Sequence, residues 1–196
     1  AISADLSNND PETTRRDSGG LTPDNSGAET HATIVSVSES PLVAGVIWVG
    51  TDDGNIWVTR NDGATWIQVN AAIPGVPPKL WVSHVEASAH EAGTAYVSFD
   101  GHRSDDFGTW VFKTTDYGAN WTNFGGGLPA NQPIHVLLAD RRNPRLVFVG
   151  SDEGASAAEL EKACTKATRA IIINSPCNPT GGGYSKKQLL EIAELA

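Results

Sequence analysis

The densest group of side chains that could do chemistry in this 196-residue chain lies within seven consecutive positions. It combines carboxylates, an imidazole and a guanidinium, on Asp100, His102, Arg103, Asp105 and Asp106. An imidazole can act as a general base near neutral pH, a guanidinium binds anions, and paired carboxylates do acid–base work or hold Ca²⁺. The spacing is not that of an EF-hand calcium loop. We interpret the segment as a loop that forms a candidate catalytic or cation site, with a solvated turn as the alternative.

A second set comprises His84 and Glu86, two positions apart in a segment of strand character, and His135 in a later strand-like segment. Residues two apart on a strand share one face of the sheet. The imidazole and the carboxylate therefore point the same way and are candidates for an acid–base pair. Histidines satisfied within the core are the alternative.

Acidic turns form the third set. Asp52 and Asp53 follow one apolar run, and Asp152 and Glu153 follow a similar run 100 residues later. Turns repeated on neighbouring units would bring these carboxylates to one face, where they could bind a cation such as Ca²⁺, or a sugar. The preference of Asp for turns explains them equally well.

The composition excludes some functions. With 14 basic and 23 acidic residues the net charge is −9, so the chain lacks the basic surface that nucleic acid requires. Its apolar runs are too short to span a membrane, and its first residues do not resemble a signal peptide. No Met is present, so we expect the chain to be cut from a longer one. Cys164 and Cys177 match no zinc pattern and leave the compartment open.

The composition of the sequence changes near residue 155. Residues 1–155 hold 9 basic and 19 acidic residues and all six Trp, whereas residues 156–196 hold 5 and 4, with both Cys. We therefore divide the chain into an N-terminal arm (1–30), a β-rich part (31–154) and a tail (155–196). The arm is polar and turn-rich, and both a poorly ordered end and a docked strand fit it.

Internal repeats predict the fold of the β-rich part. Apolar runs ending in Asp- and Gly-containing turns recur at 46–54, 94–101 and 146–154, and a second pattern recurs at 59–66 and 114–121. Together they define four-stranded units over 31–70 and 79–125 and half a unit over 133–154. Units of this length are typical of propeller blades.

The predicted fold is therefore mainly β, a partial β-propeller of about two and a half four-stranded blades with a short α/β tail. Such a set cannot close a ring alone, so we expect self-association, or else a tail that covers the open edge. On this fold His84, Glu86 and His135 belong to innermost strands and would face a central channel.

The second repeat resembles the Asp-box, Ser/Thr-x-Asp-x-Gly-x-Thr-Trp, of BNR-type β-propellers. The resemblance implies a structural role: Asp or Asn ties the hairpin backbone, Gly takes an unusual conformation, and Trp packs between sheets. Residues 18–154 also resemble bacterial sortilin-like BNR-repeat proteins, often labelled glycosyl hydrolases and often exported. The matching positions are Thr59, Asn61, Gly63, Thr65 and Trp66 in one copy, and Thr114, Asp116, Gly118, Asn120 and Trp121 in the other.

The tail resembles a different family. Residues 170–181 contain Asn-Pro-Thr-Gly, a signature of fold-type I aminotransferases that use pyridoxal phosphate (PLP), and 184–193 resemble the helix that follows it. The resemblance places Asn178 where the family contacts the PLP ring, but the other groups that hold PLP are missing from this sequence. We predict no cofactor and interpret the chain as chimeric or truncated. The strand expected over 170–174 either completes the third blade or reflects a fused coding sequence.

Three functions are then compared. The first is a binding or scaffold module for a glycan or protein ligand, completed by self-association. The second is a hydrolase of a glycoside or another ester-linked anionic substrate, using the sites above. PLP chemistry ranks last.

Overall fold

The computed structural model describes residues 2–10, 31–128, 130–151 and 185–193. Contacts divide the chain into two units, Ala1–Gly150 and Ser151–Ala196. The first unit holds the described strands, except for Ser151 at the end of the last one, and the second holds the described α-helix. No helix in these ranges has both the length and the apolar character needed to cross a bilayer.

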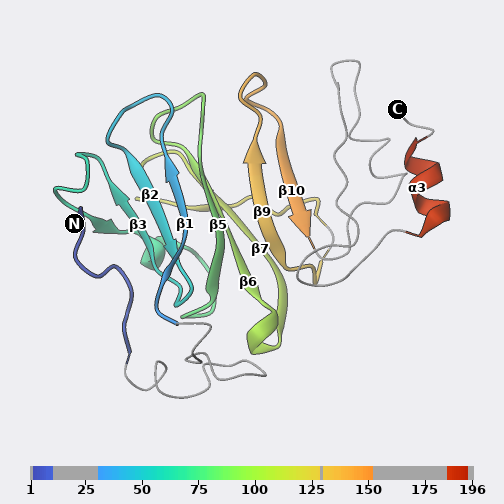
Figure 1. Cartoon of the computed structure of the whole chain (residues 1–196), viewed down its shortest axis with the longest axis horizontal. Coiled ribbons are helices and arrows are strands. Elements are labelled where there is room, and N and C mark those ends of the chain that lie inside the picture. The colour runs from blue at the N-terminus through green and yellow to red at the C-terminus, as the bar shows by residue number, and fades with distance from the viewer. Residues whose placement is uncertain (1, 11–30, 129, 152–184, 194–196) are drawn as a thin grey trace. The chain divides into compact units, whose positions relative to one another are not determined.

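The first sheet has four antiparallel strands in chain order: β1 (Ile34–Glu39), β2 (Ile47–Thr51), β3 (Ile56–Thr59) and β4 (Ile67–Gln68) (Figure 1). β-Branched and aromatic residues fill β2 and β3, which favours extended backbone. The turn between them contains Gly54 at φ 90°, a conformation that glycine adopts readily.

The second sheet repeats this order with β5 (Trp81–Ala87), β6 (Ala95–Gly101), β7 (Asp106–Thr114) and β8 (Thr122–Asn123). A 3₁₀ turn, His102–Ser104, joins β6 to β7. The two sheets also share an irregularity of register on their first strands, between Ile34 and Ser36 and between Val82 and His84.

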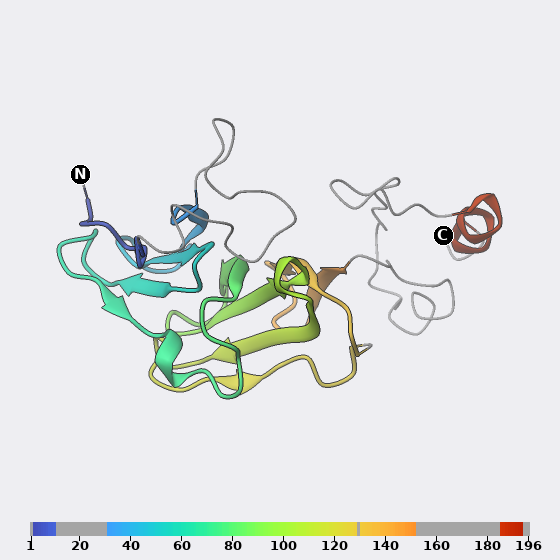
Figure 2. The same cartoon turned by 90° about the horizontal axis from the view of Figure 1, so that it is seen from below.

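A third sheet has only two described strands, β9 (Ile134–Ala139) and β10 (Val147–Ser151). The three sheets follow one another in chain order, with β5 in contact with both β1 and β9 (Figures 1 and 2). The predicted fold, mainly β with two four-stranded units and half of a third, is confirmed.

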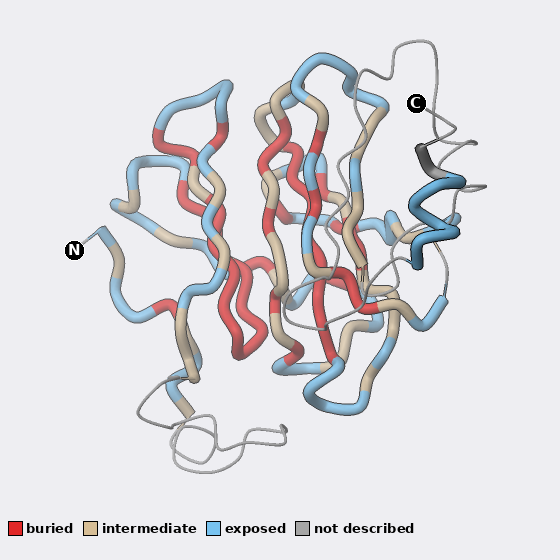
Figure 3. Tube along the Cα trace, turned by 45° about the vertical axis from the view of Figure 1, so that its right-hand side comes forward, coloured by how far each residue is buried: buried red, intermediate tan, exposed pale blue. Residues whose placement is uncertain are grey.

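The core lies where successive sheets face each other (Figure 3). Between the first two sheets, Trp48 and Trp121 meet edge to face with ring centroids 6.2 Å apart. A second cluster lies between the second and third sheets and contains Tyr96, Val111, Ile134, Leu137 and Ala139. Burial between neighbouring sheets is therefore the main apolar contribution to stability.

The Asp-box turns between the last two strands of each full sheet have one geometry. In the first, Asn61 Oδ1 accepts hydrogen bonds from the Thr65 backbone N–H at 2.9 Å and the Thr59 hydroxyl at 3.0 Å. The Gly63 N–H donates to Thr59 Oγ1 at 2.9 Å. The same bonds, at 2.9 Å each, connect Thr114, Asp116, Gly118 and Asn120 in the second. The expected tie of the hairpin backbone by Asn or Asp is confirmed.

In the second unit, α3 spans Lys186–Ala193. Ser185 and Gln188 form a capping box at the start of this helix: the Ser185 N–H donates to Gln188 Oε1 at 2.9 Å, and the Gln188 N–H donates to Ser185 Oγ at 3.3 Å. The strand expected over 170–174, Asn178 and both Cys lie outside the described residues.

Candidate functional site

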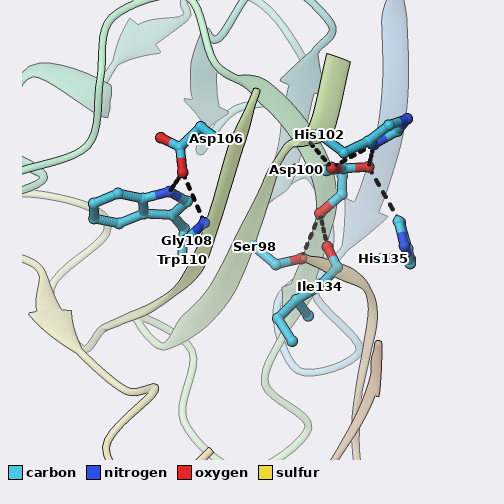
Figure 4. Close-up of polar contacts among 9 residues, drawn as sticks. Ser98, Asp100, His102, Asp106, Gly108, Trp110, Ile134 and His135 are labelled. Carbon is cyan, nitrogen blue, oxygen red and sulfur yellow. Dashed lines mark hydrogen bonds and ion pairs between the residues drawn. The ribbon is translucent and has the colours of Figure 1, made fainter. Parts of the chain in front are cut away.

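Asp100 is the centre of the candidate site. It is the penultimate residue of β6 and is 8% exposed. Its Oδ1 accepts a hydrogen bond from the His102 backbone N–H at 3.0 Å and lies 2.7 Å from His102 Nδ1 (Figure 4). The 3₁₀ turn after β6 folds the His102 ring back over the strand that carries Asp100, which produces this contact.

His135 reaches the same carboxylate from the third sheet. Its Nδ1 lies 3.2 Å from Asp100 Oδ2, and the two imidazole rings have centroids 6.3 Å apart at 72° (Figure 4). Close by, Ser83 Oγ lies 2.8 Å from Ser98 Oγ and donates to the Ile134 carbonyl. The structure thus joins Asp100 and His102 from one predicted set with His135 from the other.

The histidines set the ionisation of Asp100. Burial alone would raise its pKa, but the hydrogen bond from His135, the bonds from the backbone and ring of His102, and the charge of His102 together lower the pKa to about 2. Asp100 is therefore a carboxylate at neutral pH. An anionic partner at Nδ1 favours the tautomer that presents Nε2 as proton acceptor.

The rest of the predicted loop is arranged differently. The sequence predicted an extended loop from Asp100 to Asp106, but β6 runs to Gly101 and β7 begins at Asp106, with these two residues paired. The hairpin is short because Asp105 takes a left-handed turn at φ 60°.

This hairpin separates the charged side chains. Asp106 Oδ1 accepts from the Gly108 N–H at 2.7 Å and from Trp110 Nε1 at 3.1 Å, apart from the histidines (Figure 4). The Arg103 guanidinium lies 4.2 Å from the centre of the Trp81 ring. Asp106 is thus not part of the Asp100 cluster.

The predicted pair on β5 forms a loose contact. His84 Nε2 lies 3.9 Å from Glu86 Oε2, and both side chains are partly exposed. Their role as acid and base stays a prediction.

The acidic turn after β2 is bonded to the protein itself. Asp52 accepts from the Thr33 N–H at 2.8 Å, and Asp53 accepts from the Thr51 hydroxyl and from the Asn8 N–H, both at 2.5 Å. Asp152 and Glu153 lie outside the described residues. Within the described ranges no three His, Cys, Asp or Glu side chains are placed to hold a metal ion. A cation site at Asp52, Asp53, Asp105 or Asp106 stays a prediction.

The sequence left open whether the N-terminal arm docks as a strand, and residues 2–10 dock through contacts that it did not predict. Trp66 Nε1 donates to the Ile2 carbonyl at 3.0 Å, and Trp57 Nε1 donates to the Leu6 carbonyl at 2.6 Å. A cavity of about 750 Å³ remains between this segment and the first Asp-box turn. The segment is docked on the first sheet without forming a strand.

Comparison with known proteins separates the two units. Residues 149–196 match the family model "Aminotransferase class I and II". The chain is 60% identical over 69 residues to an aspartate aminotransferase of Pyrococcus abyssi and 53% identical over 55 residues to the putative aminotransferase YugH of Bacillus subtilis. These matches cover 35% and 27% of this chain, and 15% and 14% of the two relatives. The chain therefore corresponds to about a seventh of these enzymes.

Solved structures resemble the β-rich part. YCF48 from Cyanidioschyzon merolae aligns with 62% of this chain and 32% of its own, at 19% identity and a TM-score of 0.43. A GH74 xyloglucanase from Xanthomonas campestris aligns with 61% of this chain and 20% of its own, at 14% identity and a TM-score of 0.44. YCF48 bound to D1 peptide aligns with 53% of this chain and 29% of its own, at 19% identity and a TM-score of 0.39. We describe the sheets as blade-like from their own strand order and Asp-box turns.

Proposed function

We propose that the three sheets form a binding module whose copies complete one another by stacking end to end. One observation supports this. Apolar residues are exposed on the outer faces of the first and third sheets, whereas the equivalent residues between the sheets are buried.

The first open face is on β1. By register, Ile34 and Val37 occupy the places of Val82 and Val85 on β5. Val82 and Val85 are 0% and 2% exposed, and a Cβ added to Gly50 of β2 would meet both. Ile34 and Val37 are 47% and 61% exposed. The first sheet thus presents an uncovered copy of the surface that the second sheet buries.

The second open face is on the third sheet. Phe148 on β10 occupies the place of Trp48 on β2 and Tyr96 on β6. Trp48 and Tyr96 are 0% and 4% exposed because each packs against the following sheet, whereas Phe148 is 49% exposed. Val136 and Leu138 on β9 are also exposed.

The two open faces are complementary in origin. Inside the chain, each junction between sheets packs the face equivalent to that of Phe148 on the face equivalent to that of Ile34 and Val37. The same contact between two copies joins different faces, so it is heterologous. Such contacts form a closed ring if the rotation from one copy to the next adds up to a full turn. Burying exposed apolar area provides the driving force, at about 25 cal/mol per Å².

Paired blocking variants test this proposal. Wild-type chain is expected to form a defined oligomer in light scattering on a sizing column. Val37→Asp blocks one face and Phe148→Asp blocks the other. Each variant alone is expected to be monomeric, while an equimolar mixture gives a heterodimer through the one intact pair of faces.

The matched control is Phe107→Asp, which places the same charge at an exposed aromatic position on β7, away from both faces. It should leave the oligomer unchanged, and tryptophan fluorescence should report a native fold in all three variants. A wild-type monomer at every concentration tested, or an oligomer that survives Val37→Asp, would refute the proposal.

A second candidate function is hydrolysis, favoured by the contacts of Asp100 with two imidazoles. A carboxylate that holds Nδ1 of His102 orients the ring and leaves Nε2 as the proton acceptor, as a general base requires. Arg103 on the adjoining turn supplies positive charge for an anionic substrate, such as an acidic glycoside or a phosphate ester.

The test uses chromogenic glycosides and phosphate esters. His102→Ala should abolish any turnover together with its bell-shaped pH profile, and His84→Ala is the matched control outside the cluster. Turnover that is unchanged in His102→Ala would exclude this site as the catalytic one.

A further inference from the structure

Each full sheet has an outer corner at its Asp-box turn, and a short apolar segment covers that corner. At the second sheet the segment is Val69–Ile73, which directly follows β4. The Trp121 indole N–H donates to the Val69 carbonyl at 3.2 Å. A Cβ added to Gly118 would lie 2.7 Å from Val69 Cβ. The turn and the segment are therefore in close contact.

At the first sheet the N-terminal segment takes the same place. Trp66 is the equivalent of Trp121, and its N–H donates to the Ile2 carbonyl at 3.0 Å. Gly63 is the equivalent of Gly118, and a Cβ added there would lie 2.3 Å from the Ile2 oxygen. Ile2 thus occupies at the first corner the position that Val69 occupies at the second.

The match continues along the segment. Leu6 follows Ile2 by four residues, as Ile73 follows Val69, and both Leu6 and Ile73 are buried. A third stretch, Phe124–Leu128, has the same spacing and repeats the backbone bond from its last residue to the carbonyl three residues earlier. The corner therefore accepts a short segment with the pattern apolar-x-x-x-apolar.

The first corner differs from the second in its connection and its cover. Val69 is continuous with β4, but residues 2–10 are joined to β1 through residues 11–33, a length that spans up to about 75 Å when extended at roughly 3.3 Å per residue. Ile2 is 63% exposed, and Trp66 is only partly buried. The segment is thus held mainly by Leu6 and by polar bonds.

Three of these hydrogen bonds are made by the main chain of the segment. Trp57 Nε1 and Asn55 Nδ2 donate to the Leu6 carbonyl at 2.6 and 3.1 Å, and the Asn8 N–H donates to Asp53 at 2.5 Å. Lys79 pairs with Asp10 at 2.7 Å. The Asn8 side chain also donates to the Asp53 carbonyl at 2.9 Å and accepts from Asn55 Nδ2 at 3.2 Å, so selectivity depends on the buried leucine and on the polar side chains of Asn8 and Asp10.

We propose that this corner is a peptide-binding groove that takes residues 2–10 of a second copy in exchange for its own. The groove is on the outer side of one sheet, so the proposal does not depend on stacking through the open faces. A chain that remains monomeric at its open faces would still bind this segment as a free peptide.

The test is titration of the full chain with a synthetic peptide of residues 1–10, followed by tryptophan fluorescence. Leu6→Asp in the chain expels its own segment, and the milder Leu6→Ala weakens it with less risk to the fold. Both variants are expected to bind the peptide at least tenfold more tightly than wild type, in which the covalently joined segment competes.

Two controls assign the binding to the groove. A peptide carrying Leu6→Asp should not bind, and Trp57→Phe in the Leu6→Ala background should weaken binding at least fivefold by removing the indole donor. Folded Leu6 variants that bind no peptide, wild type that binds as tightly as they do, or binding unaffected by Trp57→Phe would each overturn the proposal.

Discussion

The two Asp-box corners have the same turn but different covers. At the second corner Trp121 is buried and is closed by residues continuous with β4, whereas at the first corner Trp66 is partly exposed and is closed by the N-terminal segment. The turn geometry is the same in both, with equal Gly–Thr bonds of 2.9 Å. The local sequence therefore determines the turn, and the neighbouring segment determines how much the turn contributes to stability.

Replacing Gly118 and Gly63 by alanine should give the largest difference in unfolding free energy between the two corners. Gly118→Ala places a Cβ 2.7 Å from Val69 at φ 85°, so strain and overpacking should lower the free energy of unfolding by about 3 kcal/mol. Gly63→Ala has the same strain, but Ile2 can move outward, so about 1 kcal/mol is expected. Urea unfolding followed by tryptophan fluorescence measures both, because all six Trp lie before residue 155. Equal losses would contradict the difference in cover.

Removing the indole donors should give the next largest contrast. Trp121→Phe leaves the buried Val69 carbonyl without its donor and opens space beside Trp48, at a cost of about 2 to 3 kcal/mol. Trp66→Phe should cost about 0.5 kcal/mol, since water can replace the donor at the exposed Ile2 carbonyl. The same unfolding measurement applies. A large loss of unfolding free energy in Trp66→Phe would show that the first corner is as tightly closed as the second.

The comparison extends to the junctions between sheets. The first junction uses neutral bonds, with Ser36 and Ser38 hydroxyls accepting from the Val85 and Ala87 N–H groups at 2.9 and 3.0 Å. The second has a neutral bond from the Ser83 hydroxyl to the Ile134 carbonyl, and in addition the contact between the Asp100 carboxylate and His135. Only the second junction should therefore respond to acid.

The pKa of Asp100 gives the direction of that response. A carboxyl whose pKa is lowered from 3.8 to about 2 stabilises the folded state above pH 4 and loses this contribution as the pH falls toward 2. The loss is about 2 kcal/mol at about 1.4 kcal/mol per pKa unit. The stability difference between wild type and Asp100→Asn should therefore shrink by that amount from pH 5 to pH 2. Matched Ser36→Ala should show a difference from wild type that does not change with pH.

The smallest effect is expected from exchanging Asn and Asp at the Asp position of the two Asp-box turns. Asn61→Asp and Asp116→Asn each keep the oxygen that accepts the two turn bonds. The hydrogen bonds from Asn120 lower the pKa of Asp116, but its exposure to water keeps the contribution small. Each exchange should leave the free energy of unfolding unchanged within the error of the measurement. A larger change in only one turn would mean that the turns are not equivalent.

The repeats made the sheets predictable. The observed strands β1 to β3 and β5 to β7 follow the expected apolar runs, because strand order in a meander needs only local information. The last strand of each full unit is short, only Ile67–Gln68 and Thr122–Asn123. The reason is local: Thr65 and Asn120 donate their N–H groups to the turn.

Contacts between sheets were not predictable in the same way. The meeting of Asp100 with His135 depends on how the third sheet packs on the second, which no motif within either sheet encodes. The extension of β6 and β7 toward the hairpin separated Asp106 from the histidines. Docking of residues 2–10 did have a signal, the four-residue spacing shared by Ile2–Leu6 and Val69–Ile73, but it is short and lies in a polar stretch.

The corner contacts also set an order for folding. The donor and acceptor are 52 residues apart at the Trp121–Val69 contact, and 51 and 64 apart at Trp57–Leu6 and Trp66–Ile2. During synthesis, each acceptor leaves the ribosome about one repeat before its tryptophan donor. Hairpins can form within a sheet first, and each closure across a repeat then adds a slower, non-local step. The chain is therefore suited to folding from its N-terminus, one sheet at a time.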